Sequence, residues 1–322
     1  MKKKAPFFIK SWAEDELTYS GVKKTLNIIL GTEGCFWAKK GGCTMCGYDN
    51  DSPHTPFVDM TLFEAEVQKH EGLHSVKIFT SGSFLDQREV PIAMQQKIID
   101  YLTSINIDEI SIESRPEFIR KSTIEVLHSF PRLKEVSIGL ETSSDRIRDL
   151  CIKKGFSFEQ FCGAAKLLKD EGIKVKAYVL IKPPFLYESD AIKDAVATAE
   201  AISDYVDTIS FNPVVVMKNT LLSRLFPKSY LPPSLFSVHR VIERTISLKN
   251  RILCDIMGKY SKRGAHNCKK CDKSVIESIQ KMILTKTPSE LPKCSCFEKY
   301  RAFIENERSI PLSYDRTFQR YL

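Results

Sequence analysis

The sequence predicts an α/β protein built on a partial (β/α)6 barrel, with a small C-terminal subdomain that binds zinc. Three observations predict this architecture. Six short β-branched runs alternate with amphipathic stretches, polar residues gather where these runs end, and a cysteine-rich segment closes the chain. Six units rather than eight favour an open barrel over a closed one. With 322 residues, the chain is long enough for one large domain and a small appendix.

The six expected strands are rich in β-branched and apolar residues, which is typical of strands buried on both faces. They comprise residues 26–30, 75–79, 109–112, 135–138, 174–181 and 207–211. The expected helices carry apolar residues at helical spacing. They comprise residues 62–70, 94–102, 123–128, 145–151, 158–169 and 191–203. In such a fold the chemistry belongs at the carboxyl ends of the strands, where the βα loops gather.

Changes in composition divide the chain into three parts. Residues 1–24 are polar, basic and aromatic and are expected to form an N-terminal arm, residues 25–250 the partial barrel, and residues 251–322 a basic, cysteine-rich C-terminal subdomain. Residues 259–322 contain 14 Lys and Arg but only 7 Asp and Glu, so they supply most of the net charge of +8. This asymmetry favours a surface that contacts nucleic acid, and a solvated basic surface is the alternative.

The sequence contains no apolar run of membrane-spanning length, and the lysines that follow Met1 lead into Pro6 rather than into the core of a signal peptide. We therefore expect a cytoplasmic protein without membrane contact. In the cytoplasm the ten cysteines are better explained as metal ligands and buried thiols than as disulfides. Cys151, Cys162 and Cys254 lie in apolar surroundings and are interpreted as core thiols.

Three cysteines follow the first expected strand in a loop rich in Gly and Lys. Cys35, Cys43 and Cys46 have the spacing C-x7-C-x2-C. Three thiolates can hold three irons of a 4Fe–4S cluster and leave the fourth iron open for a ligand. A structural zinc site would need a fourth ligand close by, and unrelated thiols are the remaining alternative. The position after the strand and the trailing aromatic Tyr48 favour the cluster, with Lys39 and Lys40 as possible contacts to phosphate.

Polar residues also follow the later strands. A loop of small residues lets backbone groups approach a ligand, carboxylates accept hydrogen bonds from hydroxyl or ammonium groups, and an Arg clamps a carboxylate. The candidate cofactor-binding residues share these properties and are Tyr48, Ser81, Gly82, Ser83, Glu113, Arg115, Glu141, Lys154 and Lys182. Asn212 is a further polar contact at the end of the sixth strand. A surface ion pair is the alternative for Glu113 and Arg115, and a solvated lysine for Lys154.

The C-terminal part holds a second set of cysteines. A C-x2-C pair, Cys268 and Cys271, and a C-x-C pair, Cys294 and Cys296, are separated by 22 residues. Two such pairs suit a tetrahedral zinc site that closes a small domain, with His266 as a possible substitute for one thiolate. A second iron–sulfur cluster and uncoordinated thiols remain open.

Several motifs occur in order along the chain: GCFWAKKGGCTMCGY, TSGSF, ESRPEF, GLETSSDRIR, KAYVLIKPPF and RGAHNCKKCD. Together they resemble the archaeal RaSEA family, the radical S-adenosylmethionine (radical SAM) enzymes of archaeosine tRNA biosynthesis. The similarity to the radical domain of the Elongator catalytic subunit is more distant. The usual superfamily spacing is C-x3-C-x2-C, and the longer first gap here resembles that of several tRNA-modifying branches.

The resemblance implies a 4Fe–4S cluster on Cys35, Cys43 and Cys46, S-adenosyl-L-methionine as cosubstrate, and tRNA as substrate. Ser81–Ser83 would receive the methionine amino group, and Lys154 stands where related enzymes carry an Arg for the methionine carboxylate. The partner enzyme ArcS would attach lysine to the 7-deazaguanine base of the D-loop. The radical enzyme, supplied by an electron donor, would then cleave the lysine C–N bond to form archaeosine.

Two other readings stay open. One is a different radical SAM tRNA modification, related to the Elongator catalytic subunit. Against it, only about 70 residues follow the barrel, which is short for a typical further domain. The other reading is a non-enzymatic tRNA-binding module that zinc stabilises. Cluster reconstitution would separate these readings.

Overall fold

The computed structural model describes residues 9–54 and 59–309. The chain divides into two compact units. The first comprises residues 1–42, 48–139 and 159–176, and the second comprises residues 43–47, 140–158 and 177–322. No helix within the described ranges is long and apolar enough to span a membrane.

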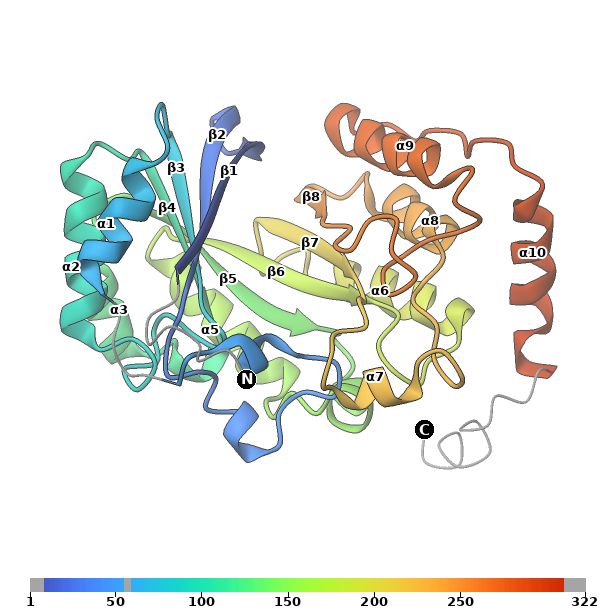
Figure 1. Cartoon of the computed structure of the whole chain (residues 1–322), viewed down its shortest axis with the longest axis horizontal. Coiled ribbons are helices and arrows are strands. Elements are labelled where there is room, and N and C mark those ends of the chain that lie inside the picture. The colour runs from blue at the N-terminus through green and yellow to red at the C-terminus, as the bar shows by residue number, and fades with distance from the viewer. Residues whose placement is uncertain (1–8, 55–58, 310–322) are drawn as a thin grey trace. The chain divides into compact units, whose positions relative to one another are not determined.

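Eight strands follow one another across the sheet in chain order (Figure 1). They are β1 Ile9–Thr18, β2 Gly21–Leu30, β3 Ser75–Phe79, β4 Glu109–Ser114, β5 Leu133–Glu141, β6 Lys174–Ile181, β7 Thr208–Pro213 and β8 Arg251–Cys254. β1 pairs antiparallel with β2, whereas β2 to β5 pair in parallel, as do β7 and β8. The six predicted strands are confirmed, and their inward residues, such as Ile28 and Val76, are fully buried.

Two strands were not predicted. Residues 9–18, expected to belong to an arm, form β1, and residues 251–254, expected to open the C-terminal subdomain, form β8. β1 alternates half-buried with exposed residues and carries several charges, so its composition does not indicate a strand. Its pairing with β2 and the stacking of Trp12 on Phe79, with ring centroids 6.4 Å apart, hold it in place. The first eight residues of the expected arm and residues 310–322 of the expected C-terminal subdomain lie outside the described residues, and the three domain bounds remain predictions.

The helices of the first unit follow strands of the same unit. They are α1 Met60–Gln68, α2 Ile92–Ser104, α3 Lys121–Leu127 and α5 Phe158–Asp170, whose first residue belongs to the second unit. Asp59 caps α1 by accepting hydrogen bonds from the N–H groups of Thr61 and Leu62. Gly172, with a φ of 73°, ends α5 in the left-handed conformation that glycine adopts without strain. These ends match the predicted helices to within a few residues.

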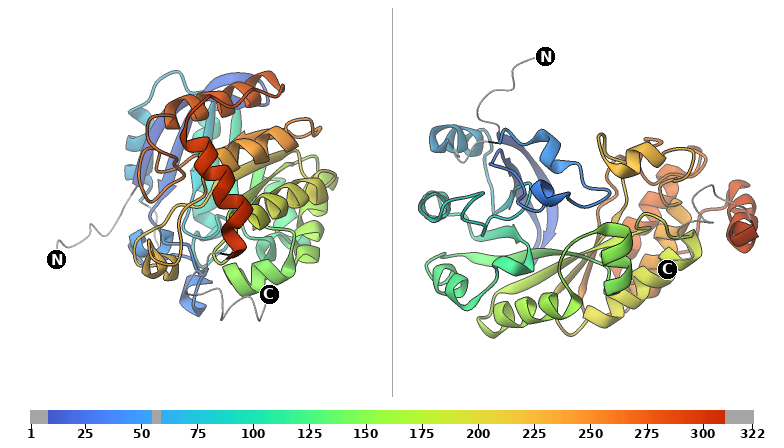
Figure 2. Two further views of the ribbon diagram at one scale, coloured as in Figure 1. Left: turned by 90° about the vertical axis from the view of Figure 1, so that its right-hand side faces the viewer. Right: turned by 90° about the horizontal axis from the view of Figure 1, so that it is seen from below.

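The second unit contains the remaining helices. They are α4 Asp145–Ile147, the π-turn Arg148–Ile152, α6 Glu188–Ile202, α7 Leu221–Leu225, α8 Leu235–Thr245, α9 Asp272–Thr285 and α10 Cys296–Asn306. α8 contacts both α6 and α9. It also contacts α10, because the ring centroid of Phe236 lies 5.2 Å from those of Phe297 and Tyr300 (Figure 2, where α10 is red). The cysteine-rich segment is therefore packed onto the other helices of its unit.

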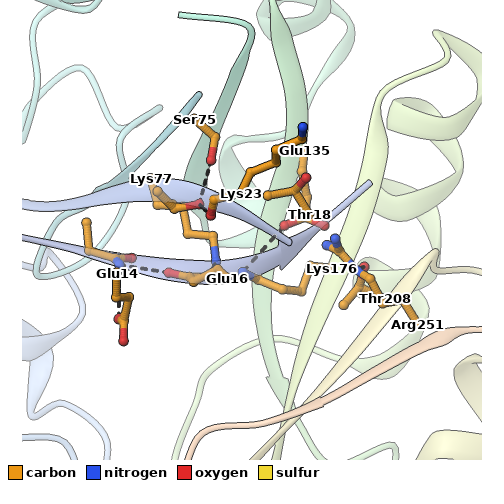
Figure 3. Close-up of polar contacts among 12 residues, drawn as sticks. Glu14, Glu16, Thr18, Lys23, Ser75, Lys77, Glu135, Lys176, Thr208 and Arg251 are labelled. Atoms are coloured by element: carbon orange, nitrogen blue, oxygen red, sulfur yellow. Dashed lines mark hydrogen bonds and ion pairs between the residues drawn. The ribbon is translucent and has the colours of Figure 1, made fainter. Parts of the chain in front are cut away.

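Charged side chains form ion pairs on the first unit's strands. Lys77 on β3 pairs with Glu16 on β1, and Lys176 Nζ on β6 lies 3.4 Å from Glu135 Oε1 on β5 (Figure 3). Tyr19, in the turn between β1 and β2, donates a hydrogen bond of 2.6 Å to the same Glu135. Buried charges are tolerated when they are paired and hydrogen-bonded in this way. The pairs tie the antiparallel hairpin to the parallel strands.

Candidate active site

The first part of the cysteine loop belongs to the first unit. Cys35 follows β2, and its backbone N–H donates a hydrogen bond of 2.8 Å to Asp49 Oδ1. Gly34 has a φ of +92°, and a Cβ at this position would lie 2.4 Å from the same Asp49 oxygen. Only glycine fits there without displacing the carboxylate that holds Cys35.

The loop after β3, which contains Ser81–Ser83, lies against Cys35. A Cβ on Gly82 would come within 2.9 Å of the Cys35 Cα. The loop is held by Glu89, whose carboxylate accepts hydrogen bonds from the N–H groups of Gly82 at 3.0 Å and Ser83 at 2.6 Å. Thr32 donates a third hydrogen bond of 2.8 Å, and burial raises the pKa of Glu89. Sequence reasoning missed Glu89 because no spacing pattern marks it.

The end of β4 is attached to the same loop. The backbone N–H of Arg115 donates to Ser83 Oγ at 2.9 Å, and the N–H of Phe84 donates to the Glu113 carbonyl at 2.9 Å. The Arg115 guanidinium is buried and donates to Glu117 Oε1 at 2.6 Å. The candidates Ser83, Glu113 and Arg115 are thus brought together, with Arg115 oriented by a carboxylate that the sequence did not identify.

The remaining part of the cysteine loop belongs to the second unit. Thr44, between Cys43 and Cys46, donates its N–H to the Ile152 carbonyl at 2.9 Å and its hydroxyl to the Cys151 carbonyl at 2.6 Å. Cys43 also packs against the apolar cluster that contains Cys151 and Ile152. The π-turn therefore supports the backbone that carries these two cysteines. π-Turns of this kind are frequent at functional sites.

Two charge pairs stand at strand ends of the second unit. Lys154 pairs with Glu141, the last residue of β5, and the side chains are 13% and 8% exposed. Lys182, directly after β6, lies 2.6 Å from Glu188 Oε2. Glu141 and Lys182 have φ values of 73° and 66°, a left-handed conformation that is uncommon for residues other than glycine. Backbone strain of this kind is concentrated at functional sites.

Other candidates have exposed or half-buried positions. Tyr48, at the start of the 3₁₀ turn Tyr48–Asp51, is 47% exposed, and Asn212 on β7 is half-buried. Lys39 pairs with Glu33 at 2.6 Å, and Lys40 Nζ lies 5.6 Å from the centroid of the Phe36 ring. The buried Cys151 is a core thiol as predicted, and burial raises its pKa to about 12.

The four C-terminal cysteines form one group. The Sγ atom of Cys268 lies 3.6 Å from the Sγ atoms of Cys271 and Cys294. The Sγ atom of Cys296 lies 3.5 Å from that of Cys271 and 3.3 Å from that of Cys294. All four lie within 4.8 Å of one another. Tetrahedral ligands with Zn–S bonds of about 2.3 Å would have sulfurs about 3.8 Å apart, so the donor set fits a single metal ion.

Two of these thiols differ from Cys268 in acidity, because burial raises the pKa of Cys271 and of Cys296. Burial raises the pKa of the Cys268 thiol, but hydrogen bonds from the Cys271 backbone N–H and the neighbouring thiols outweigh this and lower it to about 6. His266 does not belong to the group, because only the four cysteines bring their ligand atoms within 4.8 Å of one another. Its Nδ1 lies 2.8 Å from the Gly264 carbonyl oxygen. The four cysteines by themselves offer a complete tetrahedral donor set.

Residues 29–196 match the model of the radical SAM superfamily. The chain belongs to this superfamily. A protein from Methanosarcina acetivorans named archaeosine synthase subunit beta is 37% identical over 310 residues, which are 92% of this chain and 90% of that protein. A protein of the same name from Thermococcus kodakarensis is 35% identical over 312 residues, 92% of this chain and 96% of that protein. These relatives confirm the predicted resemblance to the RaSEA family.

Among solved structures, the archaeal Methanocaldococcus infernus Elp3 with an N-terminal deletion has a TM-score of 0.51 and 17% identity. The similarity covers 69% of this chain and 57% of that chain, and it shows a shared fold. The predicted fold class, a radical SAM α/β fold, is thereby confirmed.

Membership of the radical SAM superfamily implies S-adenosylmethionine and a 4Fe–4S cluster. The donor chemistry fits, because Cys35, Cys43 and Cys46 are three half-buried thiols on one loop of the chain. Burial raises the pKa of Cys35, and backbone hydrogen bonds from Ala38 and Trp37, together with the charge of Arg115, offset part of this rise. A bound iron would, like the Arg115 guanidinium, lower the pKa of Cys35 and favour its thiolate.

Proposed function

We propose that this chain is a radical SAM lyase that acts on tRNA and cleaves the C–N bond of a lysine-adducted 7-deazaguanine in the D-loop, which forms archaeosine. The observation that carries the proposal is the 37% identity, over 92% of the chain, to a protein named archaeosine synthase subunit beta. An identity that extends over the C-terminal segment as well as the radical SAM region supports a shared substrate in addition to a shared reaction type.

The residues at the strand ends would have separate binding roles. Cys35, Cys43 and Cys46 would hold the cluster, which together with S-adenosylmethionine would supply the radical chemistry that removes a hydrogen from the lysine side chain of the base. The loop of Gly82, which Glu89 fixes through two backbone N–H groups, would bind the methionine amino group. Lys154 would bind the methionine carboxylate as a point charge.

Glu141 would orient the Lys154 ammonium from the end of β5. Glu113 would accept hydrogen bonds from the ribose or the amino group, and Arg115, held by Glu117, would bind a carboxylate. Lys182 would supply charge near the substrate in partnership with Glu188. Tyr48 would stack on the adenine or donate a hydrogen bond to it.

The C-terminal segment would contact tRNA phosphates. Among the described residues, its exposed basic side chains are Lys259, Lys262, Lys269, Lys270, Lys273, Lys281, Lys286, Lys293, Lys299, Arg301 and Arg308. Contacts of this kind fix the position of a nucleic acid and weaken with salt. ArcS would supply the lysine adduct, an electron donor would reduce the cluster, and zinc would occupy the group formed by Cys268, Cys271, Cys294 and Cys296.

Anaerobic reconstitution of the cluster tests the reaction type. The wild-type chain should bind iron and sulfide, show a 4Fe–4S spectrum and cleave S-adenosylmethionine when reduced. Cys43→Ala should lose cleavage, whereas Cys162→Ala, which removes a half-buried thiol on α5, should keep it. A wild-type chain that forms no cluster and cleaves nothing would instead favour the zinc-stabilised binding module.

A further inference from the structure

Asn267 lies between the four-cysteine group and the first turn of α8. Its side-chain Nδ2 donates a hydrogen bond of 3.7 Å to the Cys271 sulfur. Its Oδ1 accepts two hydrogen bonds, from the Ser234 hydroxyl at 2.7 Å and from the Leu235 N–H at 2.9 Å. One amide side chain therefore joins a cysteine of the group to the start of a helix nearly forty residues earlier in the sequence.

Asn267 is itself held in place by its own segment. Its backbone N–H donates to Asp272 Oδ1 at 3.0 Å, and the Lys269 N–H donates to the same oxygen at 3.2 Å. Asp272 is 1% exposed and is the first residue of α9. Residues 267–272, which include Cys268 and Cys271, form a turn that we call the knuckle. Its hydrogen bonds fix the Asn267 backbone, so the position of the Asn267 side chain depends on how the knuckle is folded.

The first turn of α8 continues the connection toward β6. The Ser234 N–H donates a hydrogen bond of 2.7 Å to Glu188 Oε1, and the other oxygen of that carboxylate lies 2.6 Å from the Lys182 ammonium. Glu188 and Lys182 are buried, with 3% and 8% exposure. Because one carboxylate serves both groups, a shift of the α8 start moves the oxygen that holds Lys182.

We propose that Asn267 is a positioning residue that couples the four-cysteine metal group to the strand-end Lys182, through Ser234 and Glu188. The inference rests on the zinc site proposed above. Metal bound to the cysteines orders the knuckle, the knuckle orients Asn267, and Asn267 fixes the helix start that holds Glu188 against Lys182. Partners of metal ligands commonly orient a site in this way.

A second anchor on Glu188 provides an internal reference. Glu307 accepts hydrogen bonds from the Glu188 N–H at 2.8 Å and from the Ser189 N–H at 2.9 Å. These two amides belong to the same unit as Asn267. They are held by the Glu307 carboxylate, which takes no part in the Asn267 hydrogen bonds described above. Loss of the metal should therefore expose the Ser234 and Leu235 amides to solvent and leave the Glu188 and Ser189 amides protected.

Amide hydrogen exchange with and without a zinc chelator tests the coupling on the full chain, without any cluster or S-adenosylmethionine. In the wild type, metal removal should accelerate exchange at Ser234 and Leu235 about five- to tenfold, the range expected for loss of a hydrogen bond. Metal removal should also speed up the acylation of Lys182 by an amine-reactive reagent, as measured by peptide mass spectrometry. Asn267→Ala should show both increases with zinc still bound, and chelation should then add little.

Asn306→Ala is the matched control, because Asn306 is an exposed amide on α10 that bonds only within its own helix among the described contacts. It should behave as the wild type does. Equal acceleration at all four amides on chelation would overturn the inference, since the metal would then stabilise the unit as a whole. Unchanged exchange at Ser234 in Asn267→Ala would overturn it as well. A chain that binds no zinc refutes the zinc site, and the coupling with it, but leaves the proposed radical reaction untouched.

Discussion

Gly82 packs directly against Cys35. A Cβ at position 82 would lie 2.9 Å from the Cys35 Cα, 3.0 Å from its Cβ and 2.6 Å from Glu89 Oε2. Two of these neighbours belong to the residue that would bind the cluster, and the third belongs to the carboxylate that fixes the loop. The second βα loop and the cysteine loop are therefore fitted to each other at a position where only glycine has room.

Gly82→Ala is expected to impair cluster binding and S-adenosylmethionine cleavage. The added methyl group must displace Cys35 or Glu89, and overpacking of this kind costs about 1–3 kcal/mol. We expect the reconstituted iron content and the cleavage rate to fall at least about tenfold, because a small displacement of the groups that take part in a reaction slows it strongly. Iron analysis and the yield of 5′-deoxyadenosine measure the two quantities.

Gly163→Ala is the matched control for this variant. Gly163 lies within α5, and a Cβ there would meet no atom within 4 Å. Alanine in a helix interior should raise the free energy of unfolding by about 0.5–1 kcal/mol. Normal cluster loading in Gly82→Ala would contradict the close fit.

The Lys154 ammonium is expected to have two partners, Glu141 and the methionine carboxylate. Lys154→Gln should weaken S-adenosylmethionine binding and also destabilise the fold by about 3 kcal/mol, because it leaves the Glu141 carboxylate buried without its partner. The double variant Glu141→Gln/Lys154→Gln removes both charges. It should recover most of the stability and keep the weak binding, as measured by thermal unfolding and equilibrium dialysis.

Recovery of binding in the double variant would show that Lys154 serves Glu141 alone. Lys166→Gln is the control, because Lys166 and its partner Asp170 are exposed on α5. Neither property should change in that variant beyond a few tenths of a kcal/mol.

Asp194 should make the stability of the protein depend on pH. Burial raises its pKa to about 6, despite a hydrogen bond of 2.7 Å from the Thr142 hydroxyl. Because the folded state favours the protonated form, this contribution to stability is complete below about pH 4 and is lost as the pH rises through about 6. Asp194→Asn should therefore raise the free energy of unfolding at pH 8 by about 2 kcal/mol and have little effect near pH 4.

Chemical denaturation at both pH values measures this difference. Asp170→Asn, at an exposed position of α5, should show no such dependence. An Asp194→Asn variant that is less stable than the wild type at pH 8 would mean that the ionised carboxylate is favoured in the folded protein.

Cys268→Ser should separate stability from radical chemistry. Loss of one thiolate from the four-cysteine group should lower zinc content and reduce the free energy of unfolding by about 3 kcal/mol, the linkage expected for a tightly bound ion. The 4Fe–4S spectrum, which depends on the other set of cysteines, should persist in the folded fraction. If Cys268→Ser lost the 4Fe–4S spectrum and kept its zinc, the two metal assignments would have to be exchanged.

Local patterns in the sequence predicted the features that depend on neighbouring residues. The six predicted strands are runs of β-branched and apolar residues, and the four-cysteine group was found because closely spaced cysteine pairs are typical of metal sites. β1 was missed because its charged residues pair with residues such as Lys77, which lies about sixty positions away from Glu16. A strand that is stabilised by such distant partners has no local signature.

The side chains that hold the site in place were also outside the reach of sequence reasoning. Glu89 reaches back to the loop of Gly82 and to Thr32, and Asn267 reaches α8. Lys182 was predicted as a charge at a strand end, but its pairing with Glu188 became visible only in three dimensions. Residue type and position in the fold identified the candidate, and packing supplied its partner.

The most direct test of the proposed function is anaerobic turnover of the reduced, reconstituted chain with lysine-adducted tRNA, followed by nucleoside mass spectrometry. The account predicts that the adduct disappears and that archaeosine appears, with 5′-deoxyadenosine formed alongside it. If S-adenosylmethionine is cleaved while the adduct persists and no archaeosine forms, the chain is a radical SAM enzyme with a different substrate.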